Sequence, residues 1–148
     1  MILLDANLLL YAGVSSLPEH ERTRRWLEAQ LAARVRVGVP WVSALAFLRI
    51  ACNPRVFERP ASVARAWQQV ERWLECPTVF VPEAGERHRA IIDAWIPAVV
   101  TTSKVVPDAH VAALAVEHGL TLCSTDGDFA RFPGLRWQNP LAPATSSL

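Results

Sequence analysis

Cysteine is scarce in this sequence, and no hydrophobic run is long enough to cross a membrane. The three cysteines, Cys52, Cys76 and Cys123, are odd in number, widely spaced and without zinc-site spacing, so we expect reduced, buried thiols. The longest apolar stretch, residues 37–48, is too short to span a bilayer. No basic leader precedes the first apolar residues. We therefore expect a cytoplasmic protein with no disulfide framework and no membrane contact.

Lysine and net charge are also scarce. Arginine supplies 14 of the 15 basic residues, Lys104 is the only lysine, and the net charge is +1. So small a net charge creates no general attraction for nucleic acid. The planar guanidinium suits phosphate, but a GC-rich genome produces the same arginine bias, so composition alone identifies no binding site. A length of 148 residues with 51% hydrophobic residues predicts one ordered globular domain.

Several well-known catalytic signatures are missing. The first apolar segment is followed by Asp5-Ala6-Asn7 and not by a glycine-rich phosphate loop. No histidine pair has the HxxxH or HExxH spacing of zinc hydrolases, and no GxSxG nucleophile motif occurs. These absences disfavour nucleotide-binding loops, zinc hydrolysis and serine-type acyl transfer.

Short apolar strands alternate with helical patterns along the chain. The expected strands cover residues 1–5, 35–39, 78–81, 120–123 and, as a short edge strand, 135–137. The expected helices cover residues 18–33, 41–52, 62–74, 82–95 and 108–118. Because the strands are short and continuously apolar, this order predicts an α/β fold with a parallel sheet covered on both faces. We expect one domain over residues 1–141 and a flexible tail over residues 142–148.

Aspartate is rare, and its placement is unusual. Only five aspartates occur, and Asp5 directly follows the first expected strand, whereas Asp126 and Asp128 follow the fourth. Asp108 begins the intervening helix. The carboxyl ends of parallel strands meet at one edge of a sheet, where ligands bind. Carboxylates gathered there would hold Mg²⁺ or Mn²⁺, which can activate water and stabilise the leaving oxygen of a phosphodiester.

Each aspartate also has a simpler explanation. Asp108 could interact with the start of its helix, and Asp126 and Asp128 flank Gly127 as turn residues do. Asp5 is harder to explain, because a solitary carboxylate after a buried strand costs free energy. The four residues together favour a metal site more strongly than any one of them does.

Three segments of the chain resemble the PIN-domain ribonucleases: residues 1–7, 106–115 and 122–129. The strongest likeness is to the VapC toxins of bacterial toxin–antitoxin pairs, particularly the mycobacterial type. Further matching segments are Pro40-Trp41 and residues 47–50, 53–57 and 129–137. The resemblance covers about residues 1–141, and the order and spacing of the motifs make it specific.

The resemblance implies a three-layer α/β/α sandwich with a mostly parallel central sheet. It also implies endoribonuclease activity that depends on Mg²⁺ or Mn²⁺ and acts on cellular RNA such as transfer or ribosomal RNA. Its expected partners are a second copy of the chain in a homodimer and a VapB-like antitoxin that blocks the acidic pocket. Promoter DNA is expected to bind only through the antitoxin complex.

Carried over motif by motif, the resemblance assigns catalysis and metal binding to Asp5, Asp108 and Asp126. It implies that Asp128 is a further metal ligand. Asn7 and Thr125 match small polar positions that would orient these carboxylates through hydrogen bonds.

One expected acid is missing. The glutamate that PIN domains carry before an apolar-Leu-Arg segment is replaced by Ala46, and no acid occurs between Glu28 and Glu58. In the loop before Asp108, Lys104 would bind substrate phosphate or partly neutralise the pocket. The missing glutamate leaves a second hypothesis, a catalytically weakened PIN module that binds antitoxin or RNA without efficient cleavage.

A third hypothesis is an aspartate-based phosphoryl-transfer enzyme or receiver domain. The residues after the first strand do not form the DxD nucleophile pattern, and no aspartate ends the third expected strand. This hypothesis is therefore the least favoured.

Overall fold

A computed structural model describes residues 1–144 of the chain. The strands are β1 (Ile2–Leu4), β2 (Val37–Gly38), β3 (Val79–Phe80), β4 (Thr121–Cys123) and β5 (Trp137–Gln138). The helices are α1 (Ala6–Gly13), α2 (His20–Ala32), α3 (Trp41–Ala51), α4 (Val63–Leu74), α5 (His88–Trp95) and α6 (Val106–Glu117). Two short 3₁₀ helices are η1 (Ser103–Val105) and η2 (Gly127–Arg131).

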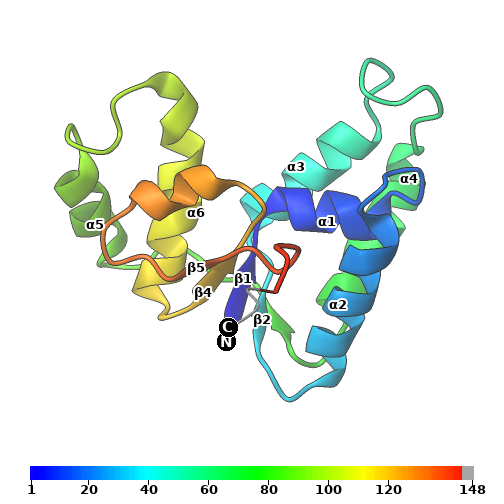
Figure 1. Cartoon of the computed structure of the whole chain (residues 1–148), viewed down its shortest axis with the longest axis horizontal. Helices are drawn as coiled ribbons and strands as arrows, with labels where there is room; N and C mark the ends of the chain where they lie inside the picture. The colour runs from blue at the N-terminus through cyan, green and yellow to red at the C-terminus, as the bar shows by residue number, and fades with distance from the viewer. Residues whose placement is uncertain (145–148) are drawn as a thin grey trace.

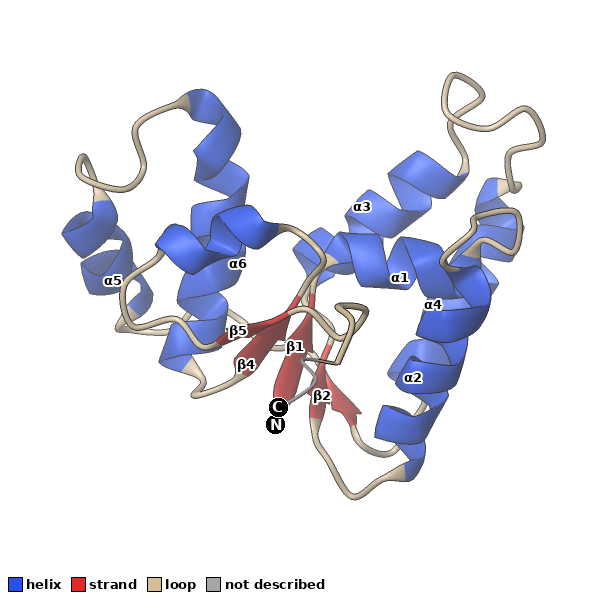
Figure 2. Cartoon of the chain, viewed as in Figure 1, coloured by secondary structure: helices blue, strands red, loops and turns tan. Residues whose placement is uncertain are grey.

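The five strands form one parallel sheet in the order β3-β2-β1-β4-β5 (Figure 2). The central strand β1 pairs with β4 through Ile2 with Thr121, and its last residue, Leu4, pairs with Cys123. Residues 5 and 124 therefore leave the sheet side by side, at the edge where all five strands end. The parallel sheet is as predicted, and the observed pairing of β1 with β4 meets the condition for their ends to come together.

Helices cover both faces of the sheet, and each face has its own hydrophobic core (Figure 1). Side chains alternate along a strand, so Leu3 and Leu122 face α5 and α6, whereas Leu4 and Cys123 face α1 to α4. All four side chains are buried. This arrangement confirms the expected three-layer α/β/α sandwich.

Local signals explain several element boundaries. Ser62 caps α4, and its hydroxyl accepts a hydrogen bond from the backbone N–H of Arg65 at 3.2 Å. Gly119 follows the end of α6 at φ +66°, a conformation that favours glycine. Both boundaries lie where the sequence pattern placed them.

Two helical predictions were wrong. Helix α1 was not predicted, because its Leu8-Leu9-Leu10 run has no clear polar face. The predicted helix over residues 82–95 begins only at His88. The backbone N–H groups of Gly85 and Arg87 donate instead to the Glu117 carboxylate, at 3.0 and 3.1 Å. Because these two N–H groups have hydrogen-bond partners outside a helix, and because glycine has a low helix propensity, the helix does not extend back over residues 82–87.

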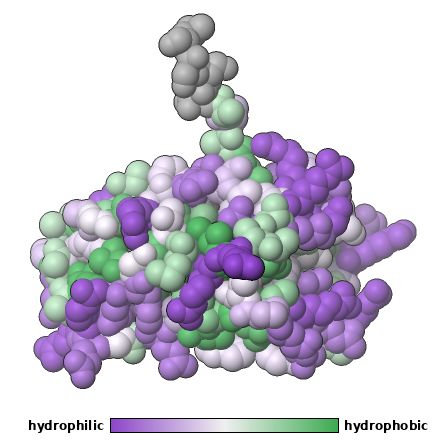
Figure 3. All heavy atoms as spheres, turned by 90° about the horizontal axis from the view of Figure 1, so that it is seen from below, coloured by the Kyte–Doolittle hydropathy of each residue, from purple (hydrophilic) through white to green (hydrophobic). Residues whose placement is uncertain are grey.

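The surface is mostly hydrophilic on the face below the sheet, where hydrophobic areas lie between polar side chains (Figure 3). Within residues 1–144, no helix has the length and apolar character needed to cross a membrane.

The three cysteines are free thiols; Cys123 is buried and the other two are half-buried. Burial raises the pKa of Cys123 to about 12, so this thiol stays protonated and unreactive. Of the expected flexible tail, residues 145–148 lie outside the described residues.

Candidate metal centre

The pairing of β1 with β4 brings Asp5 directly beside Ser124. The backbone N–H of Asp5 donates to the carbonyl oxygen of Cys123 at 3.1 Å, which continues the ladder beyond the last paired residues. The Ser124 hydroxyl donates to Asp5 Oδ2 at 2.7 Å. Asp5 also caps α1, because its Oδ1 accepts from the N–H of Ala6 at 2.8 Å. Strand pairing and helix capping together hold this carboxylate in one orientation.

Ser124 is fully buried and links three polar groups. Its Oγ donates to Asp5 and accepts from Asn7 Nδ2 at 3.0 Å and from the backbone N–H of Asp126 at 3.1 Å. A hydroxyl has one donor and two acceptor sites, so Ser124 is completely satisfied. It therefore positions the Asp5 carboxylate and the backbone of Asp126 at once.

Asn7 connects α1 to the loop after β4. Its amide nitrogen donates to Ser124 Oγ and to Thr125 Oγ1, each at 3.0 Å. Its Oδ1 is buried and forms no hydrogen bond within residues 1–144. A buried amide oxygen without a partner is unusual and has the chemistry of a ligand for a hard cation or an ordered water.

The loop after β4 carries Asp126 and Asp128 into η2. Asp126 Oδ1 accepts from the backbone N–H of Asp128 at 2.9 Å, so part of its bonding capacity serves the turn. The Asp128 carboxylate is exposed and forms an ion pair with Arg131 at 3.2 Å. Asp126 therefore does stabilise the turn, as one of the simpler explanations proposed. Its second carboxylate oxygen forms no hydrogen bond to the described residues.

Asp108 is half-buried in the first turn of α6 and belongs to the same electrostatic cluster. Burial, followed by repulsion from Asp126 and Asp5, raises the pKa of the Asp108 carboxyl to about 6, and Arg131 acts in the opposite direction. Burial also raises the pKa of Asp5, and Asp126 adds to that effect. Because Asp126, Asp5 and Asp128 all add to the rise that burial causes in the pKa of Asp108, we call the four predicted aspartates the acidic cluster.

Comparison with known proteins shows which family the chain belongs to. A family model described as the PIN domain matches residues 2–135. This chain belongs to the PIN-domain family. The resemblance seen in the motifs is thereby confirmed, including the likeness to VapC proteins.

Curated relatives of this PIN domain match it over nearly its whole length. Ribonuclease VapC37 of Mycobacterium tuberculosis is 42% identical over 142 residues, covering 96% of this chain and 99% of the relative. Ribonuclease VapC33 of the same species is 37% identical over 141 residues, with 95% and 99% covered.

A solved structure with the same fold is the crystal structure of VapBC2 from Rickettsia felis bound to a DNA fragment from their promoter. It aligns with a TM-score of 0.69 at 15% identity and covers 94% of this chain and 98% of that one. At this identity the match supports the fold alone.

The acidic cluster of this PIN domain fits a magnesium-type cation. Its donors are carboxylate and amide oxygens, the hard ligands that Mg²⁺ and Mn²⁺ prefer. Among residues 1–144, no three acid, histidine or cysteine side chains lie close enough together to surround one ion. Magnesium usually takes only one or two protein carboxylates and keeps several waters, so a site of this ion does not require three such side chains around it. A cation would also relieve the repulsion that raises the pKa values of Asp5 and Asp108.

Helix α3 of the PIN domain contributes no carboxylate to the cluster. Ala46 is half-buried on this helix, and one turn before it Ser43 is buried with a hydroxyl that has no partner within the described residues. Lys104 is exposed in η1, just before α6. The basic side chain that acts on the pKa of Asp108 is Arg131.

Asp108→Asn is expected to stabilise the metal-free protein near neutral pH. The folded-state pKa of about 6 lies above the ordinary value of 3.8, so the folded state binds more protons and its stability falls as pH rises between about 4 and 6. After allowance for solvent screening of a half-buried group, the gain is about 1 kcal/mol. Thermal denaturation in EDTA should show a Tm higher by roughly 2–4 °C. The gain should vanish below about pH 4, and a gain that persists there would contradict this assignment.

Two residues of the cluster were not found from the sequence. Ser124 is the residue after the last paired position of β4, and its importance depends on the exact register with β1. Arg131 lies in η2 and reaches back to Asp128, which no motif indicated. Knowledge of the register between β1 and β4 would have identified Ser124. Arg131 could be found only from the backbone conformation of η2, which brings it back to Asp128.

Proposed function

We propose that this chain is the toxin of a toxin–antitoxin pair and acts as a Mg²⁺- or Mn²⁺-dependent endoribonuclease. The observation that carries the proposal is the placement of Asp5, at the end of β1, beside the loop after β4 that carries Asp126, with Ser124 hydrogen-bonded to both residues. The 42% identity to a protein named ribonuclease VapC37 supports RNA as the substrate. Transfer or ribosomal RNA in the cytoplasm is the expected target class.

In this proposal each member of the cluster has a distinct role. Asp5, Asp108 and Asp126 hold the cation directly or through water, with Asp128 as a further ligand. Once bound, the cation supplies a nucleophilic water and neutralises charge on the phosphodiester. Asn7 and Thr125 orient the carboxylates, and Ser124 holds Asp5 in place.

Lys104 and Arg131 are the basic groups proposed for substrate phosphate. Lys104 is exposed immediately before the helix that carries Asp108. Arg131 already pairs with Asp128, so it moderates the negative charge that an incoming phosphate meets.

The alternative is a PIN module that binds antitoxin or RNA without efficient cleavage. The observation that favours it is the absence of any acid on α3, where Ala46 stands in place of the expected glutamate. A cluster with fewer carboxylates binds a cation less tightly.

The proposed partners are a VapB-like antitoxin and a second copy of the chain. Four exposed apolar side chains on α3 and α4 support a homodimer: Trp41, Leu45, Val63 and Trp67. Two of them, Trp41 and Trp67, stack with ring planes 9° apart. Promoter DNA is proposed to bind only through the antitoxin complex.

RNA cleavage by the purified chain is expected to depend on added metal. Incubation of total cellular RNA with Mg²⁺ or Mn²⁺ should give discrete new ends, and EDTA should abolish them. Ca²⁺ is the control, because it takes more oxygen ligands than Mg²⁺, at longer distances and in a more flexible geometry. Cleavage that survives EDTA would overturn the metal-dependent mechanism, whereas tight RNA binding with no cleavage in any metal would favour the alternative.

A further inference from the structure

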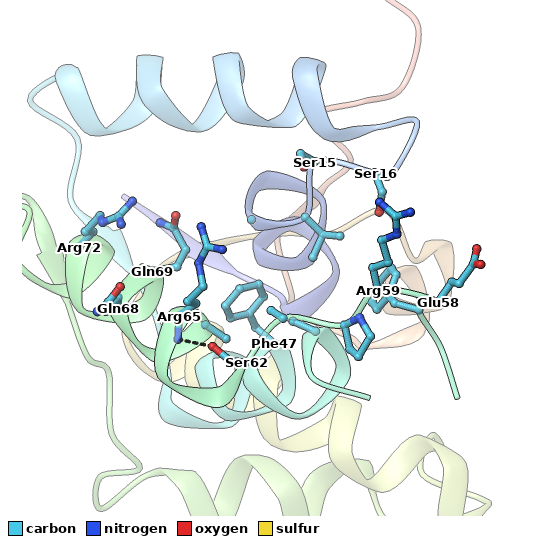
Figure 4. Close-up of a pocket in the computed structure, with 17 residues that line it drawn as sticks. Ser15, Ser16, Phe47, Glu58, Arg59, Ser62, Arg65, Gln68, Gln69 and Arg72 are labelled. Carbon is cyan, nitrogen blue, oxygen red and sulfur yellow. Dashed lines mark hydrogen bonds between the residues drawn. The ribbon is translucent and has the colours of Figure 1, made fainter. Parts of the chain in front are cut away.

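A polar groove with three arginines lies apart from the acidic cluster, between α3, α4 and the segments that flank them (Figure 4). Its volume is about 910 Å³. Arg72, Gln69 and Arg65 follow one another along α4, and Arg59 extends the row from the loop before that helix. Ser15 lies on the opposite side of the space. We call this feature the arginine groove, defined by Arg59, Arg65 and Arg72.

The three guanidinium groups form no ion pair and no hydrogen bond within residues 1–144, and all three side chains are exposed. Some other arginines of the chain are paired: Arg24 binds Glu21 and Glu28, and Arg131 binds Asp128. Glu58 is the acid that lines the groove, and it lies at the end beside Arg59. The groove therefore carries a net positive charge that the described residues leave uncompensated.

The spacing of these arginines suits an extended polyanion. Arg65 and Arg72 are seven residues apart on one helix, which places their Cα atoms about 10 Å apart along its axis. Arginine binds phosphate through a planar fork, and the neighbouring Gln68 and Gln69 amides can donate to phosphate or sugar oxygens. Grooves that track the backbone of a single nucleic-acid strand are positively charged.

Helix α1 connects the groove to the acidic cluster. Asp5 caps its first turn, and Gly13 at its other end lines the groove. A helix of eight residues is about 12 Å long, so a strand positioned in the groove can reach the cluster within a few nucleotides.

We propose that the arginine groove binds the phosphate backbone of the RNA substrate at a site remote from the acidic cluster. The groove holds the strand while the carboxylates act on a phosphodiester a few nucleotides away. This inference rests on the proposed ribonuclease function. An acidic protein segment is the competing occupant, but it offers no regular spacing of phosphates to match arginines along a helix.

The test measures RNA binding and not cleavage. Arg65→Gln/Arg72→Gln is made in an Asp126→Asn background and titrated with labelled single-stranded polyuridine in EDTA at several NaCl concentrations. The matched control is Arg34→Gln/Arg89→Gln, because Arg34 and Arg89 are exposed and do not line the groove. Circular dichroism melts compare the folding of all the proteins.

Each phosphate contact with a single strand contributes about −0.7 to the slope of log K against log[NaCl]. Removal of two contacts should therefore make this slope less steep by about 1.4. Binding should weaken, and the control should keep the parent slope. An unchanged slope, or a parent protein that does not bind polyuridine, would overturn the proposal. Selective loss of polyglutamate binding would also overturn it, in favour of an acidic protein segment. Because no cleavage is measured, failure of the groove is distinguished from failure of the nuclease.

Discussion

Asp5→Asn is expected to reduce metal-dependent RNA cleavage by at least about 100-fold while leaving the protein folded. Asparagine has the same shape and its single oxygen can still accept the hydrogen bond from Ala6, but its amide nitrogen cannot accept from Ser124. It also lacks the negative charge that a cation needs. Burial and Asp126 raise the pKa of Asp5, so the ionised carboxylate weakens the metal-free fold. Removal of this charge offsets the lost hydrogen bond from Ser124, so the variant should keep a Tm close to that of the parent in EDTA, together with the loss of activity.

Asp93→Asn is the matched control for this substitution. Asp93 lies on α5, is exposed and has only a long ion pair with Arg89, at 3.7 Å. Its replacement removes the same charge, and neither the cleavage rate nor the Tm should change measurably, as is usual for exposed ion pairs. If Asp5→Asn kept most of its activity, or lost it only by unfolding, the carboxylate would have a structural role and the proposed metal site would be wrong.

The aspartates of the cluster could be predicted because parallel strands impose a simple rule. Asp5 and Asp126 follow β1 and β4, and strands that run in parallel end at the same edge. Ser124 could not be recognised in the same way. Serine after a strand is common, and its value lies in three hydrogen bonds that exist only in the observed register. The order and direction of the strands are enough to place the aspartates. The groups that orient them can be identified only from interatomic distances in the structure.

The helices were predictable where a polar face or a cap marked them. Helix α4 has both, with Ser62 as its cap and one buried face, and it was predicted almost to the residue. Helix α1 has neither a polar face nor a conventional sequence signal, and its cap is the same Asp5 that belongs to the acidic cluster. Asp5 thus caps α1 and also belongs to the acidic cluster, and the sequence analysis recognised only the second of these roles. The extended segment over residues 82–87 depends on Glu117, which is some 30 positions away in the sequence.

Phe47→Ala is expected to cause the largest loss of stability, about 3–5 kcal/mol in the free energy of unfolding. Phe47 is 2% exposed, and its ring meets Trp73 edge to face at a centroid distance of 5.0 Å. Its packing against α1 is so close that a Cβ on Gly13 would lie 2.7 Å from Phe47 Cε2. Removal of the ring separates α3 from α1, the helix that begins at Asp5. Urea denaturation at constant pH measures the change.

Leu45→Ala is the matched control on the same helix. Leu45 is 51% exposed and lies two residues before Phe47, so its truncation removes apolar atoms without creating a cavity. It should change the free energy of unfolding by less than about 0.5 kcal/mol. Since small domains are stable by only about 5–15 kcal/mol, Phe47→Ala should also lower the amount of soluble protein, whereas Leu45→Ala should not. Equal effects of the two substitutions would mean that the packing of Phe47 against α1 and Trp73 adds little to the stability of the fold.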